Sequence, residues 1–189
     1  MSTAVVANSM SADEYLAWEE LQEEKHEYVH GEIFAMGGAR REHVLVSLNI
    51  ASALKQHLRG TPCRAYMSDM KLRVASMDTF FYPDVIVSCN QKDHQAEQYL
   101  SFPTLIVEVL SDSTEAYDRG AKFTAYRQLA ELKEFVLVDI KTRSVECFRR
   151  TADNDWLLHV YTDEDVCDFV SLDVSIEMKD IFEDIVEQQ

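Results

Sequence analysis

The stretch Thr104-Leu-Ile-Val-Glu-Val-Leu110 decides the fold class of this chain. It is an apolar run rich in β-branched residues that only Glu108 interrupts, a pattern typical of a strand covered on both faces. A second buried strand is predicted at residues 135–140, and residues 115–129 between the two keep apolar side chains at helical spacing. This order of strand, helix and strand predicts a sheet with a helix packed on its face.

The rest of the chain predicts further strands and helices around this unit. Ser11-Ala-Asp-Glu14 matches a capping box, which predicts a short helix over residues 11–24. A longer helix is predicted over 41–58 by the helical spacing of Val44, Leu45, Leu48, Ala51 and Leu54. Other strands are predicted at 26–36 with a break at Gly31, at 64–74, at 80–87, and in a hairpin at 144–150 and 156–162, with a short helix after Glu177. We therefore expect a mixed α/β fold: a central mixed sheet flanked by helices, with an added N-terminal helix and a C-terminal hairpin.

The composition bounds the class of protein. The chain has 189 residues, 47% of them hydrophobic, which is enough to bury the core of one domain. Neither a repeat nor a Pro-rich or Gly/Ser-rich linker divides it, so we expect a single domain over residues 1–189, with 1–10 as a flexible N-terminal segment. No stretch approaches the roughly 20 apolar residues that span a bilayer, so we expect a cytoplasmic protein that does not enter the membrane. Its four widely spaced cysteines are expected to be reduced thiols.

The charge is strongly acidic but uneven. With 18 Lys and Arg against 34 Asp and Glu, the formal net charge is -16, which argues against loose electrostatic attachment to nucleic acid. Residues 40–73 are the exception, because this segment contains seven basic residues and only two acidic ones. Arg40 and Arg41 open this segment and are candidates for contacts with nucleic-acid phosphates; the alternative is a solvated helix face.

Asp84 and Glu108 are the candidate metal ligands. An ionised carboxylate in an apolar strand requires a cation nearby, because its burial alone is costly. Asp84 follows Pro83 at the start of another apolar strand, so the two carboxylates converge on one ion if the strands are neighbours. Two such oxygen ligands, with water and a substrate phosphate, are how proteins usually hold Mg²⁺. The alternative for Glu108 is a buried ion pair, for which Lys122 is a candidate partner.

Lys122 is also the candidate for the cationic group of a hydrolytic site. Metal-assisted hydrolysis of a phosphodiester needs a lysine that positions water or stabilises charge, and the position two residues after Glu108 holds Leu110 instead. On the following helix, Lys122 lies four residues after Asp118 and four before Tyr126, so the three side chains project along one face. If this face looks toward the strand ends, Lys122 supplies the missing ammonium.

Together these motifs resemble the putative restriction endonuclease family of the PD-(D/E)XK nuclease superfamily. The resemblance covers residues 11–185 and is carried by Tyr28-Val-His-Gly31-Glu32-Ile33, His43, Pro83-Asp84, Glu108-Val-Leu-Ser111, Asp118, Lys122, Tyr126 and the strand that ends at Asp139. It implies a restriction-endonuclease-like αβββαβ core, a divalent metal at Asp84 and Glu108, Glu32 as a further acidic site residue, and a lysine that has moved to the helix at Lys122. Two positions depart from the family, since Asp112 stands where Pro is common and Phe135-Val-Leu137 replaces an aromatic-rich strand.

We therefore expect a Mg²⁺-dependent endonuclease that hydrolyses DNA, with Mn²⁺ as a substitute metal. The expected catalytic residues are Asp84, Glu108, Lys122 and Glu32, with His43, Asp118 and Tyr126 beside them. A homodimer is expected, because many such enzymes cut both strands of a duplex through symmetric subunits.

Two alternatives stay open. One is an inert nuclease scaffold that binds a partner, which the acidic termini favour. The other is a zinc peptidase, because His26-Glu-Tyr-Val-His30 matches the HExxH pattern. That pattern binds zinc only on a continuous helix, whereas Gly31 and strand-like residues follow it directly, so we expect a strand here.

Overall fold

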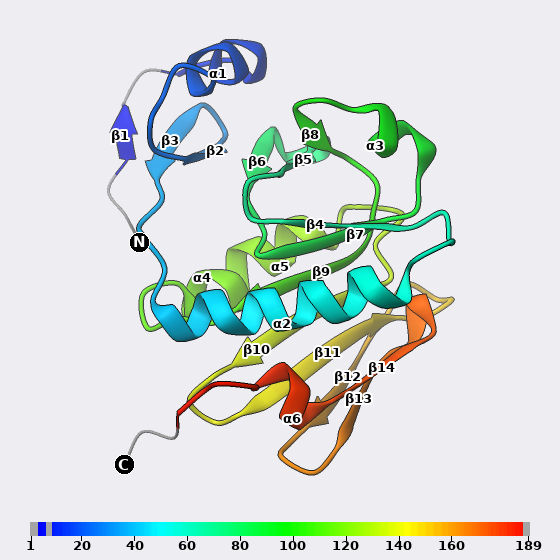
Figure 1. Ribbon diagram of the computed structural model, residues 1–189. Coiled ribbons are helices and arrows are strands. Elements are labelled where there is room, and N and C mark those ends of the chain that lie inside the picture. The colour runs from blue at the N-terminus through cyan, green and yellow to red at the C-terminus, as the bar shows by residue number, and fades with distance from the viewer. Residues whose placement is uncertain (1–3, 7–8, 187–189) are drawn as a thin grey trace.

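The centre of the protein is a six-stranded mixed sheet (Figure 1). The computed structural model describes residues 4–6 and 9–186 of the chain. From edge to edge, the strands of this main sheet are β12 (Trp156–Tyr161), β11 (Ser144–Arg150), β10 (Glu134–Asp139), β9 (Pro103–Val109), β7 (Val85–Ser88) and β4 (Arg64–Met67). Strands β9 and β10 are parallel and the other neighbours are antiparallel. All seven residues of β9 are buried, which confirms the prediction made from its apolar sequence.

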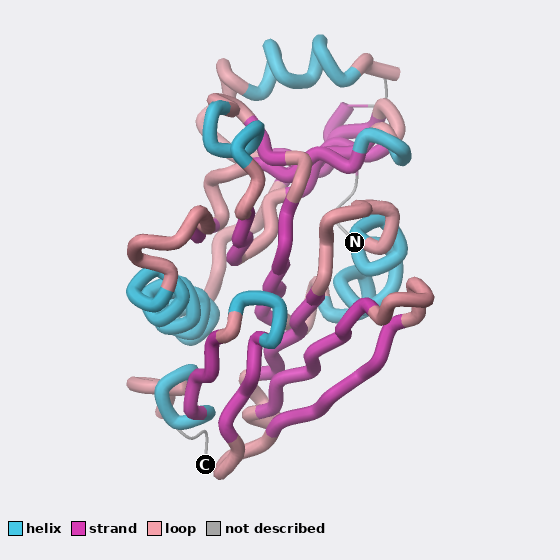
Figure 2. The backbone as a smooth tube through the Cα atoms, turned by 90° about the vertical axis from the view of Figure 1, so that its right-hand side faces the viewer, coloured by secondary structure: helices cyan, strands magenta, loops and turns pink. Residues whose placement is uncertain are grey.

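Helices cover both faces of the main sheet (Figure 2). Because side chains alternate along a strand, Leu105 and Val107 of β9 pack with helix α2 (Arg41–His57), whereas Ile106 packs with α5 (Phe123–Tyr126). Glu108 follows the same alternation and points to the α5 face. The predicted mixed α/β class, with a central mixed sheet flanked by helices, is confirmed.

Helix α2 buries only part of the stripe that its apolar spacing suggested: Ala51 and Leu54 are buried, but other members are not. Its buried residues are Val46, Ser47, Ile50, Ala51 and Leu54. Val44 and Leu48, which helped to predict the helix, are 51% and 49% exposed. The helix therefore has apolar residues on more than one face, and packing on the sheet selects the stripe that is buried.

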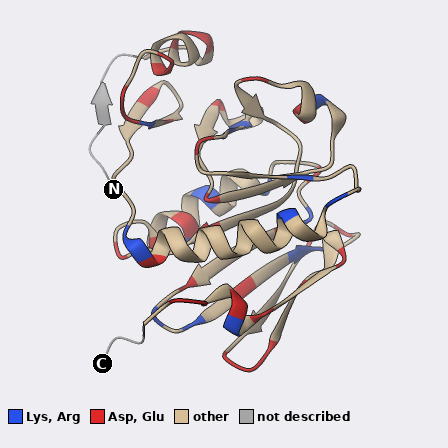
Figure 3. Cartoon of the chain, viewed as in Figure 1, with Lys and Arg blue, Asp and Glu red and all other residues tan. Residues whose placement is uncertain are grey.

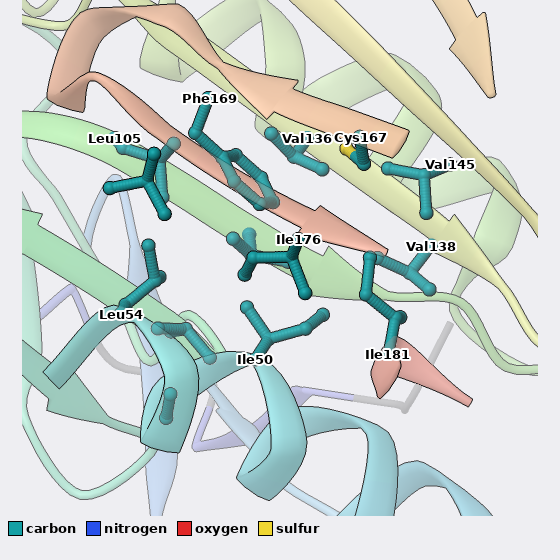
Figure 4. Close-up of a cluster of buried hydrophobic side chains, with 14 of the residues drawn as sticks. Ile50, Leu54, Leu105, Val136, Val138, Val145, Cys167, Phe169, Ile176 and Ile181 are labelled. Atoms are coloured by element: carbon teal, nitrogen blue, oxygen red, sulfur yellow. The ribbon is translucent and has the colours of Figure 1, made fainter. Parts of the chain in front are cut away.

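The C-terminal segment completes the main sheet with one hairpin and adds a small layer, made of a second hairpin and a short helix, on the α2 face of that sheet. The predicted hairpin at 144–150 and 156–162 is confirmed as β11 and β12, and the predicted short helix as α6 (Met178–Ile181). A second hairpin, β13 (Val166–Phe169) and β14 (Val174–Glu177), was not predicted. Figure 4 shows its Phe169 and Ile176 packed between α2 and the sheet.

Glu134 fastens this layer to the main sheet. Its buried carboxylate accepts hydrogen bonds from Arg149 Nε at 3.0 Å and from the backbone N–H groups of Val170 and Ser171 at 3.1 and 2.8 Å. Every partner here is a donor, so this buried carboxylate is fully compensated.

A second, smaller sheet is built mainly from the N-terminal part of the chain. Its strand order is β1 (Ala4–Val6), β3 (Glu32–Ala35), β2 (His26–Val29), β6 (Thr79–Phe81), β5 (Lys71–Val74) and β8 (Tyr99–Leu100). The predicted break at Gly31 is a tight turn in which His30 and Gly31 both have positive φ, 50° and 89°. A two-residue hairpin turn needs this conformation, which glycine adopts without strain. Residues 1–3 and 7–8 of the predicted flexible segment lie outside the described residues, but 4–6 pair with β3.

Helix α1 (Ala12–Glu19) has the predicted capping box, in which Ser11 and Glu14 bond to each other's backbone N–H groups. It ends before residue 24, where the prediction placed its end. Leu21 is 82% exposed, so no apolar contact extends the helix, and acidic side chains at 23 and 24 disfavour its continuation at the negative end of the helix dipole.

Two segments predicted as single strands are each divided between the two sheets. Residues 64–74 form β4 in the main sheet and β5 in the smaller sheet, and residues 80–87 contribute β6 to the smaller sheet and β7 to the main sheet. Apolar residues stand on both sides of each break, and the polar residues between them are few, so the pattern did not reveal the change of sheet. The second break, Tyr82–Asp84, places Asp84 where the chain enters the main sheet.

The helix predicted at 115–129 is present in three consecutive parts. These are α4 (Glu115–Tyr117), a π-helical turn at Asp118–Lys122, and α5. A short helix, α3 (Gln91–Gln95), was not predicted. Among the helices of the described residues, none combines the length and the apolar character needed to cross a membrane.

Cys63 and Cys89 form a disulfide, which corrects our expectation of four reduced thiols. The register of β4 and β7 sets Arg64 opposite Ser88, so the two cysteines meet one position further along. Cys147 and Cys167 are buried free thiols.

Reduction of this disulfide is expected to lower the free energy of unfolding by about 3 kcal/mol, because a cross-link between residues 26 positions apart restricts the unfolded chain. Urea denaturation with and without dithiothreitol measures the difference. The double variant Cys63→Ser/Cys89→Ser should match the reduced wild type and show no response to the reductant. An unchanged midpoint of the wild type on reduction would contradict the cross-link.

Candidate active site

Glu108 lies at the centre of a buried cluster of charged side chains. Its Oε1 accepts hydrogen bonds from Lys122 Nζ at 3.2 Å and from the Tyr126 hydroxyl at 2.7 Å. Lys122 and Tyr126 come from the helical segment on the same face of the main sheet, and they reach Glu108 from successive turns. The structure thus brings together side chains that the sequence placed on one helix face and one strand.

Asp84 lies beside Glu108, because the register of β7 and β9 sets the two residues at the same level of the sheet. Its Oδ2 accepts a hydrogen bond from the backbone N–H of Val109 at 2.8 Å and lies 3.2 Å from His43 Nε2. His43 stands in the first turn of α2, so the N-terminus of that helix also reaches this end of the sheet. The two predicted metal ligands are therefore neighbours, as expected for adjacent strands.

Lys122 is the last residue of the π-helical turn, and its ammonium contacts three carboxylates. Its Nζ lies 3.1 Å from Glu27 Oε1, 3.2 Å from Glu108 Oε1 and 3.3 Å from Asp118 Oδ1. The Lys122 side chain is only 8% exposed, so these ion pairs are shielded from water. A π-helical turn contains one residue more than an α-helical turn, and such turns are frequent at functional sites.

The structure places Glu27 in this cluster, and not Glu32, which corrects the assignment of Glu32 to the site. Glu27 lies on β2, where its side chain is 11% exposed and contacts Lys122. Glu32 pairs with Val29 across the hairpin, two residues further along β2, and its side chain is exposed. In the sequence, Glu27 stands out only as part of the HExxH pattern, and no local signal joins it to Glu108.

The HExxH residues do not have the geometry of a zinc site. Residues 26–29 form strand β2, as expected, and His30 lies in the turn. His26 is buried and its Nδ1 lies 3.1 Å from Glu19 Oε2. A zinc peptidase of this class needs both histidines on one helix, so the structure removes the basis of that alternative.

The cluster carries more negative than positive charge, since four carboxylates at Glu27, Asp84, Glu108 and Asp118 surround the Lys122 ammonium. Burial raises the pKa of Glu108 well above its usual range; Lys122 opposes this shift, while Asp118 and Asp84 add to it. Burial also raises the pKa of Asp118. The site therefore favours the uptake of a proton or a cation.

Lys122 stays protonated in these surroundings. Burial by itself lowers its pKa, but the carboxylates of Glu108, Glu27 and Asp118 outweigh burial and raise the pKa well above its usual range. His43 follows the same logic: burial lowers its pKa, and the hydrogen bond and negative charge of Asp84 raise it overall. Both cationic forms are thus stabilised by the excess of carboxylates.

Two buried oxygens of the cluster lack a hydrogen bond. Glu27 Oε1 and Asp118 Oδ1 lie close to Lys122 Nζ, but among the described residues neither has a partner aligned for a hydrogen bond. An under-satisfied buried carboxylate oxygen is costly and suits a cation.

The residues present fit a divalent cation that is held in part by solvent and substrate. Within residues 4–6 and 9–186, no three His, Cys, Asp or Glu side chains are arranged to hold a metal on their own. Mg²⁺ does not need such an enclosure, because one or two carboxylates with waters and substrate phosphates commonly hold it. Asp84 and Glu108 are two neighbouring carboxylates of the kind that such a site requires, and Glu27 and Asp118 add negative charge beside them.

Arg40 and Arg41 lie at the rim, outside the buried cluster. Their side chains are 79% and 68% exposed, and Figure 3 shows basic and acidic residues side by side at the first turn of α2. Arg40 Nη1 lies 3.8 Å from Asp112 Oδ2, and Arg41 Nη2 lies 3.6 Å from Glu42 Oε1.

The fold is similar to that of a solved structure, the crystal structure of a putative nuclease belonging to DUF820 from Anabaena variabilis ATCC 29413. The TM-score is 0.74 with 17% sequence identity, and the match covers 92% of this chain and 97% of that chain. At this identity the similarity shows the fold alone, and it agrees with the restriction-endonuclease-like fold implied by the sequence motifs.

Sequence comparison finds closer relatives. Over 173 residues the chain is 38% identical to Uncharacterized protein slr1290 of Synechocystis sp. (strain ATCC 27184 / PCC 6803 / Kazusa), which covers 92% of this chain and 91% of the relative. Uncharacterized protein sll1609 of the same strain is 32% identical over 160 residues, covering 84% and 90%. The Uma2 family, described as Putative restriction endonuclease, matches residues 12–178, which include every member of the charged cluster. The chain therefore belongs to the Uma2 family of putative restriction endonucleases.

Proposed function

We propose that this protein is a Mg²⁺-dependent endonuclease that hydrolyses DNA phosphodiester bonds and accepts Mn²⁺ in place of Mg²⁺. The observation that carries the proposal is the buried excess of carboxylates around Lys122, at the ends of β7 and β9. A structural ion pair needs only one carboxylate for one lysine, whereas a metal site benefits from the surplus. Membership of a family of putative restriction endonucleases supports DNA as the substrate. We also propose that the protein acts in the cytoplasm.

In this proposal Asp84 and Glu108 hold the divalent cation. When bound, the metal polarises the scissile phosphate and lowers the pKa of the attacking water. Within the described part of the chain, the polar contacts of Glu108 are made by Oε1 and those of Asp84 by Oδ2. The other oxygen of each carboxylate is thus left for the metal.

Lys122 orients the attacking water or stabilises the charge that develops on the phosphate. Three carboxylates hold its ammonium at the ends of the strands, so little freedom is lost when the substrate binds. Tyr126 and His43 act as positioning residues, because they hold Glu108 and Asp84 respectively.

Cleavage of supercoiled plasmid and of single-stranded DNA at low salt tests the proposal. The purified protein is expected to nick or linearise plasmid with Mg²⁺ or Mn²⁺ and to be inactive in EDTA. Absence of cleavage with both metals would favour the remaining alternative, an inert nuclease scaffold that binds a partner.

Divalent metal is expected to raise the melting temperature of the wild type, because a ligand that binds only the native state stabilises it. The gain is about 2.7 kcal/mol at a metal concentration of about 100 times Kd. Asp84→Asn should lose most of this response. Glu134→Gln changes a buried carboxylate outside the cluster and should keep it. If the melting temperature of the wild type did not change on addition of Mg²⁺, Mn²⁺ or Ca²⁺, the result would contradict the metal site.

We also propose that two copies associate through β12, an edge strand of the main sheet. This strand carries no charged residue in a chain of net charge -16, and its Leu157, Leu158 and Val160 are 55%, 45% and 55% exposed. Open edges without charges tend to pair with another strand, and a two-fold pairing supplies two active sites for two DNA strands. Sedimentation should give a dimer for the wild type and a monomer for Val160→Lys; a monomeric wild type contradicts the proposal.

A further inference from the structure

Two basic side chains from distant parts of the sequence share one acidic partner beside the proposed active site. Asp112, in the loop after β9, uses Oδ1 for an ion pair with Lys141 Nζ and Oδ2 for a contact with Arg40 Nη1 at 3.8 Å. Arg40 directly precedes α2, and Lys141 lies in the turn between β10 and β11. All three side chains are exposed, at 52% for Asp112, 79% for Arg40 and 68% for Lys141.

This group of three lies at the same end of the main sheet as the charged cluster. Strands β9 and β10 run parallel, so their C-terminal ends lie at the same end of the sheet. The loop with Asp112 and the turn with Lys141 both begin there. Glu108 is the next-to-last residue of β9, which places it at that end of the sheet. Arg40 is three residues before His43, which contacts Asp84. The group therefore lies at the same end of the main sheet as Asp84 and Glu108.

Asp112 resembles a backbone phosphate in its charge and in its pair of oxygens. Each of its two oxygens faces a different cation, in the way that the two non-bridging oxygens of a backbone phosphate do, and both groups carry one negative charge. Stability of the fold does not account for the arrangement, because exposed ion pairs contribute little.

We propose that Arg40 and Lys141 form a subsite for a backbone phosphate adjacent to the scissile one, and that Asp112 occupies this subsite in the free protein. Substrate binding exchanges the Asp112 carboxylate for phosphate, so Asp112 lowers the affinity for nucleic acid. The inference rests on the proposed function for the class of ligand, but it concerns binding and not cleavage.

Fluorescence anisotropy with a labelled DNA duplex in EDTA measures this affinity without cleavage. Asp112→Asn is expected to bind about three- to tenfold more tightly than the wild type, with a salt dependence that is steeper by about one released counterion. Arg40→Gln/Lys141→Gln is expected to bind less tightly than the wild type, with a shallower salt dependence. Asp153→Asn is the matched control: it makes the same change of charge at an exposed position beyond the other end of β11, and its affinity should stay close to that of the wild type.

Equal affinities for Asp112→Asn and Asp153→Asn would overturn the proposal, and so would undetectable binding by all proteins at low salt. Plasmid cleavage by the same proteins reports separately on the proposed function. Tighter binding by Asp112→Asn without cleavage by any protein supports the subsite and rejects the nuclease. Cleavage by the wild type, with no effect of these substitutions on affinity, rejects the subsite alone.

Discussion

Asp84→Asn and Glu108→Gln are each expected to lower metal-dependent DNA cleavage at least about a hundredfold while the protein stays folded. An amide does not replace a carboxylate as a ligand of Mg²⁺, but its oxygen still accepts the N–H of Val109 or the hydroxyl of Tyr126. The local structure therefore persists when the metal site is lost. Rates of plasmid nicking at saturating Mg²⁺ measure the effect.

Glu134→Gln separates catalysis from stability in this experiment. Glu134 is compensated by donors only, so its replacement should weaken the fold and leave cleavage unchanged. Glu108 lies among excess carboxylates, so Glu108→Gln relieves repulsion and should leave the metal-free stability unchanged or higher. Cleavage by Asp84→Asn or Glu108→Gln at the wild-type rate would refute the assignment of the metal ligands.

Lys122→Met is expected to remove cleavage and to lower the free energy of unfolding in metal-free buffer by about 3 to 5 kcal/mol. The substitution retains the apolar length of the side chain but leaves the carboxylates of Glu27, Glu108 and Asp118 without their cation. Urea denaturation measures the loss. Divalent metal should restore part of the stability, since it supplies positive charge to the same carboxylates.

Arg127→Met is the control for Lys122→Met, because Arg127 follows directly after α5 but is exposed to solvent. Its effect on stability is expected to stay within about 0.5 kcal/mol. Normal cleavage by Lys122→Met would show that the lysine is only the partner of a structural ion pair, which was the alternative for Glu108.

The parts of the fold that the sequence predicted are those in which a local pattern and the tertiary environment agree. Strand β9 is apolar because it is buried on both faces, and the capping box of α1 is a contact between near neighbours. The division of residues 64–74 and 80–87 between the two sheets was not predicted, because strands of either sheet contain the same kinds of apolar residues. That the whole chain forms one domain stays a prediction.

Local patterns also decide which residues of the candidate site could be predicted from the sequence. Glu108 and Lys122 were predictable, because a carboxylate within an apolar strand and a lysine in register on the next helix are local irregularities. Glu27 joins them only through the pairing of β2 with β6 and the approach of the helical segment, neither of which leaves a local trace. The disulfide was missed for a related reason, since the register of β4 and β7 alone brings Cys63 to Cys89.

The long sequence separation within the charged cluster also bears on synthesis of the protein. Glu27 comes from an early hairpin, whereas Asp118 and Lys122 are translated much later, so a nascent chain on the ribosome lacks the ammonium that holds the carboxylates together. Contacts of such long range carry a loop-closure cost and form slowly. A chain that ends before Lys122 therefore has carboxylates but no assembled cluster.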